Sequence, residues 1–344
     1  MNSSLWYDRV PPTPSTIAAE RRAFILDVVW AILGALGVVG NLFVIVVIGS
    51  VKELRGITNL LIANQSLIDL LSSLLVFLWW VPPPPLNEDR LIRSKLICMT
   101  FEHRYFFWGS VLASTFNLVF INLERYYAVL HPIKYKINIT TKRGVQIAIL
   151  PWVIGFGFQI YTWFIYRVVG TTCERVISRS GELALGVIVF ISQYLFPLIL
   201  MLFVHARIAA AMGTRIGDMA ERPRENQTEG QASNEVEQQA VPVPSYRDRA
   251  RKNIIKSLLT VTITFAVCWT PNQIIYLVYN LGGHVDFSGV FYNITVAMAF
   301  FNMCCNPLIY TFQYRKFQKG VRALISKGVD LVSVNDQTGS TQSN

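Results

Sequence analysis

The sequence is poor in charged residues, which make up 15% of its 344 residues, whereas 52% are apolar. A soluble domain usually carries about a quarter charged residues, so this composition argues against a soluble protein. Histidine is also scarce, and the four copies are scattered without a His-Glu-x-x-His pattern or a Ser, His and acid set, which counts against an enzyme. We find no internal repeat. This counts against a secondary transporter, which we keep as the alternative from a different class.

The apolar residues are gathered into seven long runs. Each run is long enough to cross about 30 Å of hydrocarbon as a helix, which takes roughly 20 residues. Since lipid admits only helices and closed barrels, we predict an all-α membrane protein with one seven-transmembrane helix bundle over residues 24–312. The runs are Phe24–Ser50, Ile57–Val81, Phe101–Tyr127, Gly144–Tyr166, Leu183–Ile208, Asn253–Asn280 and Phe287–Phe312.

Three polar segments flank or interrupt the bundle. Residues 1–23 form a short tail without a cleavable signal pattern. Residues 211–249 have few aromatics, and we expect a disordered loop there. Residues 313–344 begin with basic and apolar residues near helical spacing, which predicts a short amphipathic eighth helix on the membrane surface followed by a tail.

The excess of basic residues indicates membrane topology. If the N-terminus is outside, 21 of the 31 Lys and Arg residues fall on the inner side and 10 on the outer side. This is the positive-inside bias, so we predict a plasma-membrane protein with an extracellular N-terminus and a cytoplasmic C-terminus. The net charge of +10 then needs no nucleic acid as partner. Asn2 begins a glycosylation sequon in the outer tail.

Only five cysteines are present. Cys268, Cys304 and Cys305 lie within predicted spans, whereas Cys98 and Cys173 are the two that face the predicted outer side. Disulfides persist on the oxidising side of a membrane. The sequence therefore predicts a disulfide between Cys98 and Cys173.

A few polar or kinking residues interrupt the spans. Asp69 is the only acid of the second span, and a carboxylate in mid-membrane is a functional hypothesis by default. Glu124 and Arg125 place an acid and a base side by side at the end of the third span. Pro271 and Pro307 predict kinks in the sixth and seventh spans.

Together these motifs resemble those of a rhodopsin-like (class A) G-protein-coupled receptor, and the resemblance extends from Gly40 to Phe317. Its markers occur in the family's order. They are Gly40-Asn41, Asp69, Glu124-Arg125-Tyr126, Trp152, Pro197, Cys268-Trp269-Thr270-Pro271 and Asn306-Pro307-Leu308-Ile309-Tyr310.

The resemblance implies roles for these residues. It implies binding of an extracellular ligand, activation of a heterotrimeric G protein, binding of arrestin and contact with the lipid bilayer. The residues implied in coupling and activation are Glu124, Arg125, Tyr126, Pro132, Ile133, His205, Phe265, Trp269, Pro271, Asn306, Pro307 and Tyr310. No cofactor is implied except an allosteric Na⁺, held by Asp69, Ser114, Asn302 and Asn306.

Three positions depart from the family's pattern. Cys98 lies 27 residues before Arg125, two more than expected, so we expect a bulged or overwound start of the third span. His205 replaces a Tyr, which suggests weak or pH-dependent signalling because His titrates near neutral pH. Arg251 replaces an acid that would hold Arg125 at rest, which predicts basal activity.

The class of ligand is inferred from residues at the outer ends of the predicted spans. Phe107 stands where an amine receptor needs an Asp, and the last span has no Lys for a retinal Schiff base. The outer mouth is aromatic and charged, which favours a peptide and a neuropeptide-receptor-like protein; the alternative is a lipid or small acid contacting Arg104. The predicted pocket residues are Trp79, Glu102, His103, Arg104, Phe107, Gln273, Tyr276 and Tyr292.

Overall fold

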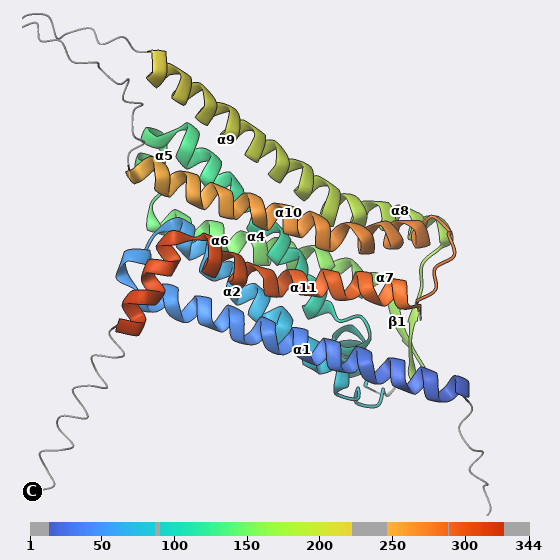
Figure 1. Ribbon diagram of the computed structural model, residues 1–344. Coiled ribbons are helices and arrows are strands. Elements are labelled where there is room, and N and C mark those ends of the chain that lie inside the picture. Colours follow the sequence, from blue (N-terminus) through green and yellow to red (C-terminus); the bar gives the residue numbers. More distant parts are fainter. Residues whose placement is uncertain (1–13, 87–89, 222–245, 288, 327–344) are drawn as a thin grey trace, which may run out of the picture.

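The computed structural model describes residues 14–86, 90–221, 246–287 and 289–326. Within these residues, seven helices are long and apolar enough to cross a membrane, at the positions that the apolar runs predict (Figure 1). The fifth of these spans consists of two helical segments joined by a π-helical turn. The helices are α1 (Pro14–Ser50), α2 (Ile57–Val76), α4 (Tyr105–Leu130), α6 (Thr141–Phe158), α8 (Arg179–Phe190) with α9 (Phe196–Glu221), α10 (Tyr246–Asn280) and α11 (Val290–Gln313).

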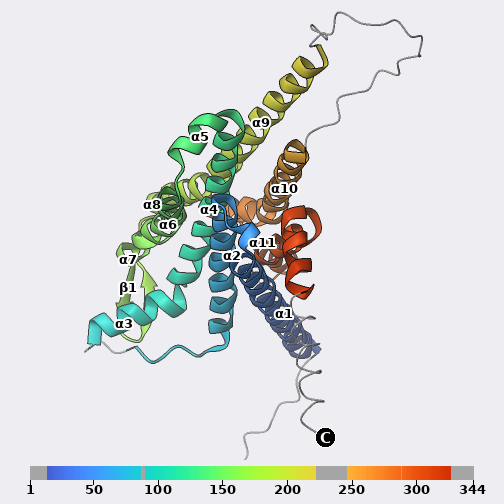
Figure 2. The same cartoon turned by 90° about the vertical axis from the view of Figure 1, so that its left-hand side faces the viewer.

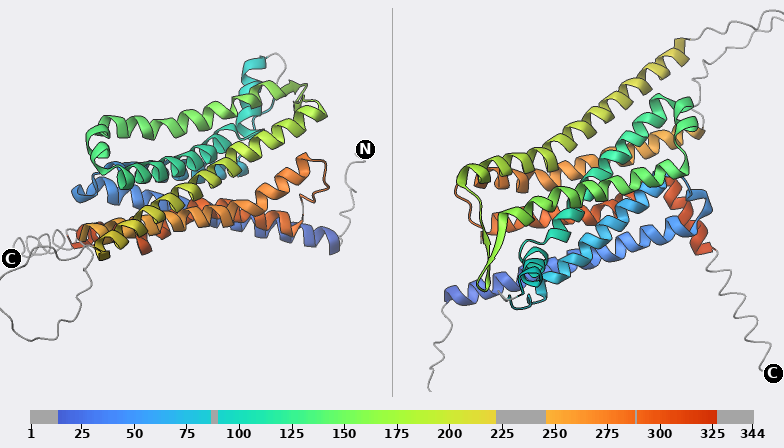
Figure 3. Two further views of the ribbon diagram at one scale, coloured as in Figure 1. Left: turned by 90° about the horizontal axis from the view of Figure 1, so that it is seen from above. Right: turned by 180° about the vertical axis from the view of Figure 1, so that it is seen from behind.

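Short elements connect these helices. A two-stranded antiparallel hairpin, which the sequence did not suggest, follows the fourth span; its strands pair Tyr166 with Arg175, and Gly170 takes a φ of +59° at its turn. We call the side of the bundle with the hairpin the hairpin end (Figure 3). The opposite side, where α4 ends shortly after Arg125, is the Arg125 end. The connecting elements are α3 (Leu91–Ile97), α5 (Pro132–Asn138), α7 (Thr162–Ile165), β1 (Tyr166–Val169), β2 (Thr172–Arg175), 3-10 turns at Lys52–Leu54, Phe77–Trp80 and Gln159–Tyr161, and π-helical turns at Cys98–Glu102 and Ile191–Leu195.

The bundle is arranged around α4, which packs against α2, α6 and α9 (Figure 2). Large apolar side chains such as Leu36, Val153 and Phe203 point outward and are exposed, which suits a lipid surface. Polar side chains such as Asn41 and Asp69 are instead fully buried between the helices. This distribution is the reverse of a soluble protein's, and it makes the chain a multi-pass membrane protein.

Glycine allows the close approach of α1 to its neighbours. A Cβ at Gly37 would lie 2.1 Å from Ser73 Oγ on α2, and one at Gly40 would lie 3.2 Å from Pro307 on α11. Small residues are a common means of close packing between membrane helices.

The ends of the flanking segments differ from the prediction. Helix α9 continues to Glu221 and α10 starts at Tyr246, so both ends of the predicted 211–249 loop are helical, because the helices extend beyond their apolar runs. Residues 315–326 form the predicted eighth helix, but Phe317 is fully buried and packs on Phe43 of α1. Its apolar face therefore meets the bundle. Asn2, the remainder of the predicted loop and the C-terminal tail lie outside the described residues.

Candidate functional site

A cavity of about 530 Å³ opens at the hairpin end. This volume lies within the range of about 300–1,000 Å³ that is usual for ligand sites. It brings together all eight residues predicted for the pocket: Trp79, Glu102, His103, Arg104, Phe107, Gln273, Tyr276 and Tyr292. The hairpin and α8 add residues that the sequence did not single out, including Tyr166 and Leu185.

The start of the third span is irregular, as the extra spacing predicts. Helix α3 passes into the π-helical turn Cys98–Glu102, and α4 begins only after Arg104. Arg104 takes a left-handed conformation, with φ 52° and ψ 43°, which is uncommon for a residue with a side chain. The break absorbs the two extra residues.

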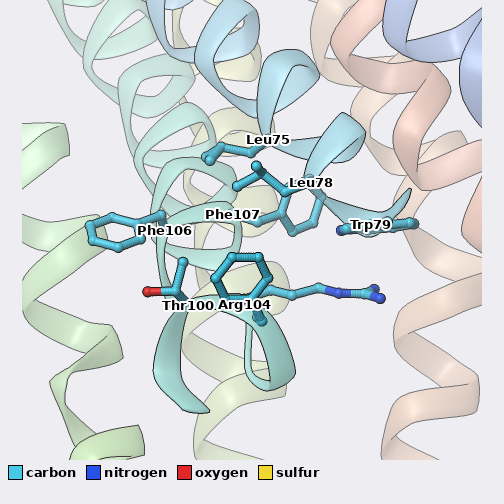
Figure 4. Close-up of a pocket in the computed structure, with 8 residues that line it drawn as sticks. Leu75, Leu78, Trp79, Thr100, Arg104, Phe106 and Phe107 are labelled. Carbon is cyan, nitrogen blue, oxygen red and sulfur yellow. The ribbon is translucent and has the colours of Figure 1, made fainter. Parts of the chain in front are cut away.

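The break directs Arg104 into the cavity. Its guanidinium carbon lies 3.9 Å from the centroid of the Trp79 ring, a cation–π contact that Figure 4 shows together with Phe107. Among the described residues, no carboxylate forms a salt bridge with Arg104. Burial lowers the pKa of the Arg104 guanidinium, opposed by Glu102 and Tyr292. The Arg104 guanidinium is therefore available to bind an acidic group of a ligand.

The hairpin is held over the cavity by the Cys98–Cys173 disulfide, as predicted. His103 stacks on Tyr166 of β1, and its Nε2 lies 3.2 Å from the Cys173 sulfur. Burial lowers the pKa of His103 to about 4, with further contributions from Arg175 and Lys95. The ring is therefore neutral at physiological pH. A disulfide offers no thiolate, so this grouping of two sulfurs and one imidazole is not a metal site.

Several buried polar atoms that line the cavity have no hydrogen-bond partner among the residues that the structure describes. They are Trp79 Nε1, Arg175 Nε, Trp269 Nε1 and Gln273 Oε1. A buried polar atom without a partner costs about 1–3 kcal/mol. A ligand with both donors and acceptors would remove part of this cost.

Trp269 of α10 lines the cavity. Its ring lies 6.3 Å from that of Phe265, which is fully buried and stacks 6.2 Å from Tyr194. Pro271 lies inside α10 just after Trp269. The Trp269 side of the cavity thus adjoins a position where the helix lacks one backbone hydrogen bond.

Half-way along the bundle, Asp69 is completely buried. Ser114 Oγ donates to its Oδ1 at 2.7 Å, and Asn306 Nδ2 donates to its Oδ2 at 2.8 Å. Gln65 Nε2 lies 3.1 Å from each of the two oxygens. One acid of α2 is therefore bonded to α4 and α11 at once.

At the Arg125 end, Glu124 and Arg125 form a bidentate pair, with Arg125 Nε donating to Glu124 Oε2 at 2.6 Å. Thr58 of α2 and Tyr135 of α5 also donate to the Glu124 carboxylate. The Glu124 side chain is 2% exposed and that of Arg125 is 15% exposed. This end of α4 is therefore closed by an ion pair with two supporting hydroxyls.

The short helix α5 lies next to this pair. Pro132 occupies its first turn, where the missing N–H is not needed. Ile133 is 75% exposed, and Tyr126 packs partly buried against Val129, Val204 and Ile208. An exposed isoleucine beside a buried ion pair is an available contact point for a partner protein.

Comparison with known proteins gives the family. Residues 40–310 match the protein family described as "7 transmembrane receptor (rhodopsin family)". The chain belongs to the rhodopsin family of seven-transmembrane receptors. Receptors of this family are not enzymes. The receptor is 27% identical to the allatostatin-A receptor of Bombyx mori over 88% of this chain and 79% of that protein.

Two other relatives illustrate the breadth of the family. The pyroglutamylated RF-amide peptide receptor of Mus musculus is 24% identical over 89% of this receptor and 70% of its own length. The trace amine-associated receptor 5 of Mus musculus is 28% identical over 85% of this receptor and 82% of its own length. Identity at this level does not separate ligand classes.

The sodium site that the family implies can be tested on this receptor's residues. Gln65, Ser114 and Asn306 all act as hydrogen-bond donors to the two oxygens of Asp69. Asn302 is buried one turn before Asn306, but within the described residues it makes no hydrogen bond to Asp69. The residues present do not fit a cation at this carboxylate, because its neighbours point N–H and O–H donors at it where a cation would need lone pairs.

Gln65 is the residue of this site that the sequence analysis missed. It lies four residues before Asp69 on α2, a spacing that places both side chains on one helix face. That spacing was the signal that could have revealed it. Tyr310, predicted to act with Asn306, is fully buried, and its hydroxyl has no partner in the described part of the receptor.

The other two departures have different outcomes. His205 of α9 is buried, and its Nε2 lies 3.1 Å from Thr262 Oγ1 of α10, so it joins two helices as a Tyr could. Arg251 lies on α10, but its side chain is outside the described part of the receptor. Its predicted effect on basal activity stays a prediction.

Proposed function

We propose that this receptor binds an extracellular peptide in the cavity at the hairpin end and activates a heterotrimeric G protein at the Arg125 end. The observation that carries the ligand proposal is Arg104, a partly buried cation that rests on Trp79 without a carboxylate partner among the described residues. The peptide then contributes an acidic group to Arg104.

The lining of the cavity supports a peptide over an amine. Phe107 is buried at the position where an amine ligand would need an acid. The cavity wall also supplies the tyrosines Tyr161, Tyr166, Tyr276, Tyr279 and Tyr292. Aromatic walls with open polar atoms suit a chain of amides and mixed side chains. A relative named for a peptide ligand agrees with this proposal.

The orientation is supported by charge and by the disulfide. The predicted inner side carries 21 of the 31 Lys and Arg residues, and cytoplasmic loops carry such an excess. Disulfides persist outside the cytosol, and Cys98–Cys173 lies at the hairpin end. The hairpin end then faces outward at the plasma membrane, and a G protein meets Ile133 and the Arg125 end from the cytoplasm.

The signal would pass along α10. A ligand on Trp269 presses on the segment that Pro271 weakens, and a hinge there can swing the Arg125 end of the helix. Access of a G protein to Arg125 requires that the Glu124–Arg125 pair open. Arrestin would bind the same face.

The test is G-protein activation in cells that express the receptor, with and without a crude peptide extract, before and after digestion of the extract by protease. Arg104→Gln should raise the half-maximal extract concentration about 10-fold or more, because a charged hydrogen bond is lost. Arg104→Lys keeps the charge and should lose less. Arg125→Ala, expressed at the same level on the cell surface, is the control for a receptor that cannot activate the G protein.

Protease sensitivity establishes the peptide. A protease-resistant response that still depends on Arg104 would instead assign a lipid or small acidic ligand. A protease-sensitive response that Arg104→Gln leaves unchanged would refute the acidic contact.

A further inference from the structure

The hydrogen-bond partners of Asp69 are all donors. Gln65 Nε2 shares its two hydrogens among both carboxylate oxygens and Ser114 Oγ. Ser114 and Asn306 add one hydrogen bond each. Every one of these partners presents a hydrogen to the carboxylate, whereas a bound cation requires lone pairs that point at it. The environment is built for hydrogen-bond donors.

The orientation of the Gln65 amide is set by a relay of amides that begins in α6. Trp152 Nε1 can only donate, and it donates to Asn64 Oδ1 at 3.0 Å. Asn64 must then present its NH₂, which donates to Ala148 O at 2.9 Å and to Asn117 Oδ1 at 2.8 Å.

The relay continues through α4. Asn117 Nδ2 donates to Leu61 O at 3.0 Å and to Gln65 Oε1 at 2.8 Å. Since its oxygen is used in this way, Gln65 has only its NH₂ left for Asp69. A donor-only indole and two main-chain carbonyls therefore determine, through three amides, which atom of Gln65 faces the acid.

We propose that the Gln65 amide takes the place of a cation at Asp69, so that the resting state of this receptor does not depend on Na⁺. For Gln65 to offer its oxygen to an ion, it would have to turn over and set its NH₂ against that of Asn117. Asn117 and Asn64 would then have to turn over as well, losing their bonds to Leu61 O and Ala148 O. The relay therefore opposes a cation at more than one position.

The proposal does not rest on the identity of the ligand or on G-protein coupling. It assigns Gln65 as a positioning residue that holds the Asp69 carboxylate between α2, α4 and α11. Ion dependence separates this role from a merely structural one, because a structural role changes stability equally in every salt.

The experiment measures the thermal unfolding midpoint of the purified receptor in NaCl and in N-methyl-D-glucamine chloride at equal ionic strength. The variants are Gln65→Leu, Asp69→Asn and, as a matched control, Ser72→Ala. Ser72 lies on the same helix, is equally buried and bonds to Ser110, outside the relay. Gln65→Met serves as a second variant of similar length in case Gln65→Leu does not fold.

We expect the same midpoint for the wild type in both salts. Gln65→Leu should gain an Na⁺-specific rise of at least about 2 °C, because the freed carboxylate can bind the ion. Ser72→Ala should be less stable but equally so in both salts.

Two outcomes would overturn the proposal. One is an Na⁺-specific rise in the wild type that Asp69→Asn abolishes, since the ion then binds despite Gln65. The other is the absence of any Na⁺-specific rise in folded Gln65→Leu and Gln65→Met, since Gln65 is then not what excludes the ion.

Discussion

The cavity at the hairpin end and the amide relay around Asp69 contain the same kinds of buried polar side chains but treat them differently. In the cavity, Trp269 Nε1 and Gln273 Oε1 have no hydrogen-bond partner within the described part of the receptor. In the relay, the side-chain amides of Asn64, Gln65 and Asn117 each use both their oxygen and their NH₂. A polar atom without a partner can form a hydrogen bond with a ligand. Polar atoms that are already hydrogen-bonded across helices instead specify how the helices pack.

The charged groups follow the same division. Arg104 is partly exposed to the cavity and rests on a ring. Asp69 and Glu124 are buried and receive donors from two or more other helices or helical segments. The difference agrees with the proposal that the cavity binds the ligand, whereas the groups in the middle and at the Arg125 end hold the helices to one another.

The largest effect should come from breaking the relay at its centre. Asn117→Ala removes three hydrogen bonds and leaves Gln65 Oε1 without its donor. Bonds between membrane helices average about 0.6 kcal/mol each, so we expect a loss of about 2 kcal/mol in the free energy of unfolding. Gln273→Ala in the cavity removes an atom that had no partner, and should change stability by less than about 0.5 kcal/mol. Equal thermal shifts for both would erase the distinction.

A second test concerns the closed Arg125 end. Glu124→Gln keeps a side chain that Thr58 and Tyr135 can bond but removes the charge that holds Arg125. If the ion pair favours the resting state by about 1 kcal/mol, basal G-protein activation should rise roughly five-fold. Thr58→Val, which leaves the ion pair in place, should raise basal G-protein activation less. Basal activity that is identical in Glu124→Gln and wild type would show that the pair does not hold the resting state.

A third test sharpens the contrast through pH. The pKa of His103 is lowered to about 4 in the folded receptor, chiefly by burial. The unfolded chain therefore binds a proton between about pH 6.5 and pH 4 that the folded receptor does not, and stability falls as the pH falls through this window. His103→Phe keeps the ring against Tyr166 and should flatten the dependence of the unfolding midpoint on pH. His284→Phe, in an exposed loop, is the control, and a profile that His103→Phe leaves unchanged contradicts the assignment.

A small effect is also expected where a buried hydrogen bond lies outside the relay. His205 bonds to Thr262, but the Thr262 hydroxyl also donates to Leu258 O at 3.1 Å. His205→Phe keeps the ring and leaves Thr262 satisfied, so the unfolding free energy should change by less than about 1 kcal/mol. If thermal unfolding shows that His205→Phe lowers stability as much as Asn117→Ala does, this expectation is wrong, and His205 makes a larger contribution to helix packing than its bond to Thr262 accounts for.

Much of this site could be predicted because membranes constrain sequences strongly. Long apolar runs located the seven spans, and the unusual acid Asp69 and the Glu124–Arg125 pair were conspicuous among apolar neighbours. The eight predicted pocket residues also line one cavity. What escaped prediction were neutral residues, above all Gln65, whose importance depends on partners 49 to 52 positions away.

The sequence by itself determined the number of helices, their order in the membrane and the residues too polar to face lipid, because hydropathy and charge act locally along the chain. The tertiary structure alone decided that Arg104 turns onto Trp79 and that Asp69 meets an amide. Both outcomes depend on the break before α4 and on the direction of hydrogen bonds across four helices. A hydrogen bond has a donor and an acceptor, and only the folded arrangement determines which atom faces which.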